Sequence, residues 1–207
     1  FAAELFRHYH APASVEPDAA FALLDTVLNL PMNRVSPADQ TLLVEFATWW
    51  LEHGEASQKA AALRLFRYLL TVLSPDAPER QIMAEAVESA DCVISTPLLF
   101  LQAQVGAHLG LDVSAHRALL DHPDAISTVF LDTATPWVLK AVGVEYLLDQ
   151  VEQGNRANVL HIATHFSNLI KVSENVVVRR MAGASLLSIA PVLTPDRRNE
   201  IAVELSK

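Results

Sequence analysis

The 207-residue chain lacks sequence features that are typical of disulfide-bonded, membrane-spanning and secreted proteins. Its single cysteine, Cys92, excludes a disulfide within the chain, and with no bridge to protect we expect a reducing, cytoplasmic location. No run of about 18 apolar residues is free of charge and proline, so the sequence predicts no membrane span. We also find no charged and apolar segments of the secretory type at the start.

Signals for β-structure are scarce as well. Glycine occurs six times, Asn-Gly and Asp-Gly turns are absent, and no segment alternates apolar and polar β-branched residues. Apolar residues nevertheless make up 51% of the chain, with many leucines and alanines, which suits helices. The sequence therefore predicts an all-α protein.

Basic residues are outnumbered, with 15 Lys and Arg against 24 Asp and Glu and a net charge of -9. This balance argues against nucleic acid or another polyanion as partner, because phosphate binding needs a basic surface. Gly-rich phosphate loops, paired catalytic carboxylates and Cys-x-x-Cys pairs are also absent. We therefore expect a protein without catalytic residues or a cofactor.

The clearest helix lies between Asn175 and Leu193. Val178, Ala182, Leu186 and Ile189 recur at steps of four, four and three, which places them on one apolar stripe. Asn175 has the short polar side chain of an N-cap. Pro191 lacks the N–H that a further turn needs, so the helix is expected to end near Ala190.

Cap and proline signals recur along the chain at a spacing of about 40 residues. One set of helices is expected to begin near Pro17, Ser57, Pro97, Pro136 and Val176, and the intervening set near Ser36, Ser74, Ser114, Asn155 and Thr194. A two-helix unit of this length falls in the range of the HEAT and armadillo repeats.

Val178-Arg179, followed by Ala182, Gly183 and Ala184 and then by Leu186-Leu187, resembles the second helix of a HEAT repeat. The resemblance implies a right-handed α-solenoid of antiparallel helix pairs, and it assigns Arg179 as a structural lock between repeats. The arginine has no counterpart 40 or 120 residues earlier, where Leu139 and Lys59 stand.

The predicted organisation is one repeat domain over 1–207. Its approximate units are 1–35, 36–73, 74–113, 114–154, 155–193 and a partial unit 194–207. Residues 121–124 break the fourth unit, so we expect three helices in that unit, as in an armadillo repeat. The first residue is Phe1 and the last unit lacks a second helix, so we expect a piece of a longer protein in which Ile201 and Leu205 face the preceding pair.

His161 and His165 are the candidate metal ligands, because side chains at i and i+4 meet on one helix face. A zincin motif would need Glu beside the first histidine, where Ile162 stands. A partner-facing or capping role is the alternative. His8 and His10 form a second pair, which we expect at the surface.

Three further groups of residues are candidates for function. Cys92 has no base beside it in the sequence, so we expect a buried or loop thiol. Adjacent Trp49 and Trp50 point about 100° apart on a helix, so one should lie in the core and the other partly at the surface. Candidate partner-binding residues on the second helices are Arg64, Arg67 and Arg180.

We therefore expect a non-catalytic protein-protein interaction scaffold that binds a protein or peptide on a solenoid face. One alternative resembles the HEAT-like alkylpurine glycosylases, which would need a basic channel. Another resembles the HEAT-like hydroxylases, which would need tandem His-Glu pairs to hold metal.

Overall fold

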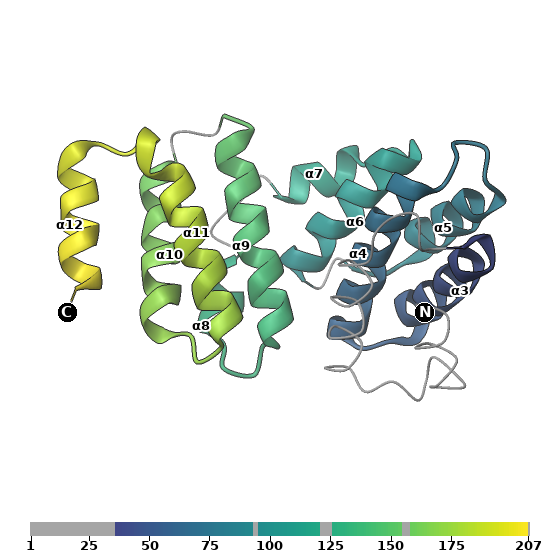
Figure 1. Cartoon of the computed structure of the whole chain (residues 1–207), viewed down its shortest axis with the longest axis horizontal. Coiled ribbons are helices and arrows are strands. Elements are labelled where there is room, and N and C mark those ends of the chain that lie inside the picture. The colour runs from purple at the N-terminus through teal and green to yellow at the C-terminus, as the bar shows by residue number, and fades with distance from the viewer. Residues whose placement is uncertain (1–35, 93–94, 121–125, 155–157, 207) are drawn as a thin grey trace. The chain divides into compact units, whose positions relative to one another are not determined.

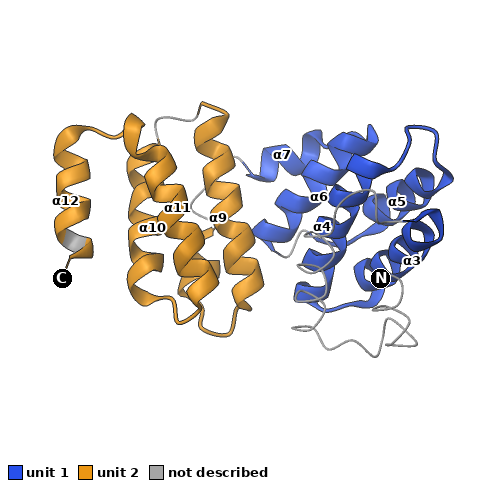
Figure 2. Ribbon diagram, in the orientation of Figure 1, with its two compact units in different colours: residues 1–121 blue, residues 122–207 orange. Residues whose placement is uncertain are grey.

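The computed structural model describes residues 36–92, 95–120, 126–154 and 158–206, and these are all-helical. They contain ten α-helices and no strand, which confirms the predicted all-α class (Figure 1). The chain divides into two compact units, residues 1–121 and 122–207 (Figure 2). The boundary falls inside the predicted unit 114–154, and the single domain over 1–207 stays a prediction.

Unit 1 contains five described helices: α3 (Pro37–His53), α4 (Ala56–Val72), α5 (Pro78–Ser89), α6 (Thr96–Leu109) and α7 (Ser114–Leu120). Helix α3 packs on α4 and α5 packs on α6, so the first four helices form two hairpins. The hairpins contact each other through α3 with α5 and α4 with α6. Large side chains fill the space between them, including the fully buried Trp50, Phe66 and Met83.

Unit 2 contains α8 (Ile126–Leu131), α9 (Trp137–Glu152), α10 (Val159–Val172), α11 (Val176–Ile189) and α12 (Pro195–Leu205), among its described residues. Helices α9, α10 and α11 lie side by side (Figure 1). Helix α8 packs on α9, and α12 packs on α10. The buried side chains of Tyr146 and Phe166 are the largest in this core.

The helix expected after Asn175 is present as α11. The Asn175 side-chain oxygen accepts hydrogen bonds from the amides of Val177 and Val178 at 2.8 and 3.2 Å, as an N-cap does. The four predicted core residues, Val178, Ala182, Leu186 and Ile189, are buried. A short 3₁₀ turn at 190–192 contains Pro191 and ends the helix there.

Two other predicted helix starts are confirmed at the level of single hydrogen bonds. Ser36 and Asp39 form a capping box, in which each side chain accepts from the other residue's backbone amide at 3.2 Å. Thr194 Oγ1 accepts from the Arg197 amide at 3.3 Å at the start of α12. The predicted starts at Pro17 and Asn155 lie outside the described residues.

The predicted start at Ser74 is wrong, because α5 begins at Pro78 and Ala77 is its N-cap. A residue that precedes proline is disfavoured in the α region. Ala77 is accordingly extended, with φ -65° and ψ 131°. Residues 75–76 form a turn instead, closed by the Ala77 amide donating to the Ser74 carbonyl at 3.1 Å.

Smaller shifts occur at other starts. Helix α6 begins at Thr96, one residue before the predicted Pro97, and α4 begins at Ala56 rather than Ser57. Helix α9 begins at Trp137, with the predicted Pro136 as its N-cap.

The prediction that Ile201 and Leu205 of α12 face the preceding helix pair holds in part. Ile201 is buried, and α12 packs on α10 of the preceding pair. Leu205 keeps 37% of its surface exposed. None of the helices in the described ranges is both long and apolar enough to cross a membrane.

Candidate functional site

Helix α10 carries the two histidines that the sequence singled out. Its buried face contains Ile162, Ala163 and Phe166, so residues on the opposite side face solvent. His161 is exposed and His165 is half-buried on that outer side. We refer to His161 and His165 as the histidine pair.

The two imidazoles of the histidine pair meet, as their spacing predicts. Nε2 of His161 and Nε2 of His165 lie 2.9 Å apart, which is hydrogen-bonding distance. The rings are nearly perpendicular, at 83°, with centroids 4.4 Å apart. One ring nitrogen of each imidazole therefore lies beside the other at the surface of α10.

Helix α8 supplies two side chains to the histidine pair. Ser127 Oγ lies 3.3 Å from His165 Nε2, and the Phe130 ring lies 5.7 Å from the His165 ring at a tilt of 59°. These contacts restrict the His165 ring to one orientation. Sequence reasoning missed Ser127 and Phe130, because nothing local to α10 indicates that α8 packs beside it.

The donor set around the histidine pair contains no carboxylate that completes a three-ligand cluster. Within the described ranges, no group of three or more His, Cys, Asp or Glu side chains is placed to hold a metal ion. The pair therefore offers two nitrogens. The role of His161 and His165 as metal ligands stays a prediction at this point.

Helix α11 presents a second surface of interest on unit 2. Its solvent-facing residues are Val176, Val177, Arg180, Ala184, Leu187 and Ser188, and we call the first five the α11 outer face. Leu187 is 76% exposed, and Arg180 is the only charged residue in the set. A surface helix usually places polar residues opposite its buried stripe, so an apolar outer face is unusual.

Arg179, next to Arg180, turns inward toward the loop before its own helix. Its Nη1 donates to the carbonyl oxygens of Ser173 and Glu174 at 2.6 and 2.9 Å. The arginine therefore ties α11 to the end of α10, within one helix pair. Its role as a lock between repeats stays a prediction.

The candidate arginines of unit 1 are half-buried on α4. Arg67 Nη1 donates to Gln104 Oε1 on α6 at 2.9 Å, and burial lowers the pKa of its guanidinium. Arg64 lies one turn before it. Arg67 thus joins two packed helices, whereas Arg180 of unit 2 is exposed.

The tryptophan pair divides as predicted. Trp50 is fully buried, and its ring meets Phe46 edge-on at 6.0 Å. Trp49 is half-buried, and its ring stacks on His53 at 5.1 Å. One tryptophan therefore belongs to the core of unit 1 and the other to its margin.

Cys92 is fully buried after α5, in agreement with the expectation of a buried or loop thiol. Burial raises its pKa to about 11, and the nearby Asp91 carboxylate acts in the same direction against the opposing charge of Lys59. The thiolate is the nucleophilic form of cysteine, so this environment opposes nucleophilic chemistry at neutral pH.

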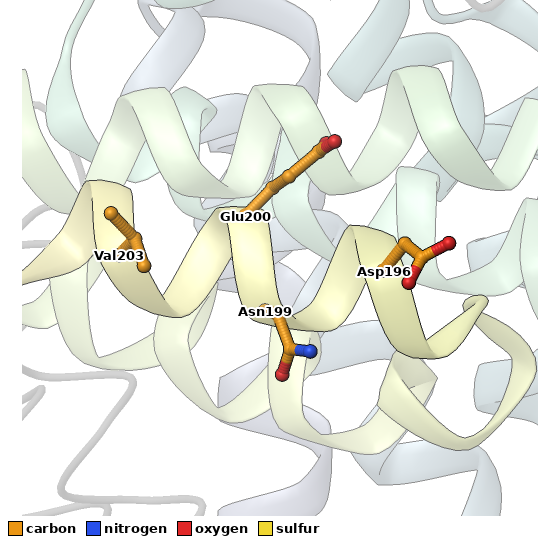
Figure 3. Close-up of a pocket in the computed structure, with 4 residues that line it drawn as sticks. All are labelled: Asp196, Asn199, Glu200 and Val203. Atoms are coloured by element: carbon orange, nitrogen blue, oxygen red, sulfur yellow. The ribbon is translucent and has the colours of Figure 1, made fainter.

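Two depressions lie on the surface of the described residues. One of about 510 Å³ lies on α12 and is lined by Asp196, Asn199, Glu200 and Val203, whose exposed side chains point in different directions (Figure 3). Another, of about 630 Å³, lies between the end of α6 and the start of α7. The second depression is lined by Asp112 and Ser114 among others, and the Asp112 carboxylate accepts from the Ser114 amide at 3.0 Å at the start of α7.

Comparison of the chain with protein-family models, with curated protein sequences and with solved structures finds no match in any of the three. A function for this chain therefore has to rest on its own sequence and geometry.

Proposed function

We propose that the protein is a non-catalytic interaction scaffold built from HEAT-like helix pairs, and that it binds a helical peptide segment of a partner protein on the α11 outer face. The observation that carries this proposal is the exposed apolar surface of α11, where Val176, Val177 and Leu187 surround a single charge, Arg180. Exposed apolar patches of this kind often mark interaction sites.

The packing of the helices supports the solenoid part of the proposal. In each unit, helices pack on the next helix and on the next but one, as stacked hairpins do. Helices α4, α6, α9 and α11 begin at 56, 96, 137 and 176, at steps of 40, 41 and 39 residues. This spacing is typical of HEAT and armadillo repeats.

The shape and charge of the α11 outer face favour an amphipathic helix as the bound element. Ala184 and the half-buried Gly183 lie between the larger apolar residues, and a Cβ added at Gly183 would meet nothing within 4 Å. A partner helix can therefore approach α11 closely at this point. Helix α11 contains no acidic residue, so a carboxylate of the partner can pair with Arg180.

The test is a selection of helical peptides from a display library on the full chain, followed by affinity measurements with purified peptides. We expect the selected peptides to carry apolar residues at i, i+3 or i+4, and i+7, together with an acidic residue. Leu187→Asp should weaken their binding by about tenfold or more, since it places a charge in the most exposed apolar position of the interface.

Leu131→Asp is the matched control, because Leu131 lies in the same unit on α8 and is similarly exposed, at 78%. This variant should bind the peptides as the unchanged chain does. If both variants lose binding equally, or if neither does, the α11 outer face is not the docking site. Arg180→Glu should shift the selection from acidic to basic peptides, which a nonspecific apolar contact would not do.

A further inference from the structure

We propose that the histidine pair is a two-nitrogen binding site for a divalent transition-metal ion, with copper(II) preferred. This site is separate from the α11 outer face and does not depend on the scaffold proposal. The starting observation is the 2.9 Å separation of the two Nε2 atoms, which share a hydrogen bond. An ion that replaces the proton between them would have one nitrogen of each imidazole within reach.

The separation is compatible with two ligands of one ion. An ion about 2.0–2.1 Å from each of two nitrogens that lie 2.9 Å apart would subtend an N–metal–N angle of about 90°. That is the angle between neighbouring ligands in square-planar or tetragonal coordination, the geometry of copper(II) and nickel(II).

The chemistry of the donor atoms also favours copper(II). Imidazole nitrogen suits copper, nickel and zinc, whereas magnesium and calcium prefer carboxylate and carbonyl oxygen. Helix α10 carries no Asp or Glu at all. Among divalent ions that favour nitrogen, copper(II) binds most tightly at a given site.

The surroundings of the histidine pair reduce the cost of binding. The contact of the His165 ring with Phe130 helps to hold that ring in place, so one of the two ligands is already oriented. The Ser127 hydroxyl lies 3.3 Å from Nε2, the proposed ligand atom, so it must turn away from this nitrogen when the ion binds. His161 is exposed, which gives the ion a path from solvent. Water would occupy the other coordination positions, since no third protein ligand is clustered there among the described residues.

The experiment is a titration of the chelator-treated full chain with copper(II) against a competing ligand of known affinity, with electron paramagnetic resonance of the bound ion. We expect one ion per chain at the histidine pair and a spectrum with two imidazole nitrogens. His161→Ala should weaken binding by about tenfold or more, because the second ligand no longer acts at high effective concentration. His165→Ala should do the same.

Two control variants address the other histidines. His8→Ala/His10→Ala removes the only His-x-His sequence in the chain, a plausible competing copper ligand, and should leave the site at the histidine pair intact. His108→Ala removes a lone exposed histidine on α6 and should also have no effect. Far-UV circular dichroism of each variant checks that the helices are retained.

The proposal is overturned if His161→Ala binds copper as the unchanged chain does, or if the only copper bound is lost with His8 and His10. Nickel(II) and zinc(II) titrations test the choice of metal. Binding in the order copper, nickel, zinc supports the cis geometry and nitrogen donors described above, and tighter binding of zinc than of copper contradicts the preference.

Discussion

Gly143 of α9 lies directly against the ring of Phe130 of α8. A Cβ added at Gly143 would stand 2.8 Å from Phe130 Cε1, closer than real Cβ contacts, and 3.0 Å from Ile126 Cδ1, tighter than most of them. The absence of a side chain at Gly143 therefore allows α8 to pack on α9. The same Phe130 ring also contacts His165, so this close approach helps to position the histidine pair.

Gly143→Ala should lower the free energy of unfolding by about 1–3 kcal/mol, because the methyl group displaces Phe130 and Ile126. The measurement is urea or thermal unfolding followed by circular dichroism. Gly183→Ala is the matched control, since this helical glycine of α11 has open space at the Cβ position. It should be neutral or stabilising by up to about 1 kcal/mol, and equal destabilisation by the two changes would contradict the packing described.

Arg179→Ala should destabilise the protein by about 1–3 kcal/mol, because it removes two charge-assisted hydrogen bonds to the carbonyls of Ser173 and Glu174. The neighbouring Arg180→Ala removes the same charge from an exposed position and should change stability by no more than about 0.5 kcal/mol. Chemical denaturation of both variants checks the difference. Similar effects at the two positions would mean that the loop contacts of Arg179 contribute little.

Gln102 joins the middle of α6 to the end of α5. Its buried amide nitrogen donates to the carbonyls of Val87 and Ala90 at 2.8 and 2.9 Å, which satisfies acceptors left over at the helix end. Gln102→Met keeps the length of the side chain but leaves these carbonyls without that donor. We expect a loss of about 1–3 kcal/mol in unfolding free energy, and a variant as stable as the unchanged chain would refute this.

The buried thiol of Cys92 should react slowly with a disulfide reagent at neutral pH and rapidly once the chain is unfolded. Its pKa is raised to about 11 from an ordinary value of 9.0. The unfolded state therefore loses the proton first, so the stability contributed by the protonated thiol is complete below pH 9 and is lost as pH rises toward 11.

Unfolding curves at several alkaline pH values check the effect of Cys92 on stability. The difference in unfolding free energy between the unchanged chain and Cys92→Ala should shrink across pH 9 to 11. Comparing the two chains cancels the contributions of lysines and tyrosines that also titrate there. A constant difference would show that the folded thiol titrates in its ordinary range.

Local signals in the sequence predicted the helices better than their exact starts. Asn175 and Thr194 cap the predicted helices, because an N-cap depends on atoms only two or three residues away. The predicted start at Ser74 was wrong because Pro78 disfavours a helical conformation at Ala77. The helix therefore begins at Pro78.

The candidate site was predictable only in part, for a similar reason. Spacing alone brought His161 and His165 together, since both lie on one helix. The contacts of His165 with Ser127 and Phe130 join residues 35 to 38 positions apart and depend on the space left by Gly143. No local pattern in the sequence encodes such an approach between helices.

The hairpin packing of each unit also bears on how fast it can fold. The extensive contacts of α3 to α6, and of α9 to α12, join helices that are neighbours or next neighbours along the chain. Closing the short loops between such partners costs little entropy. Helical proteins with local contacts fold in microseconds to milliseconds, so each unit should acquire its core early and expose unpaired apolar helix faces only briefly.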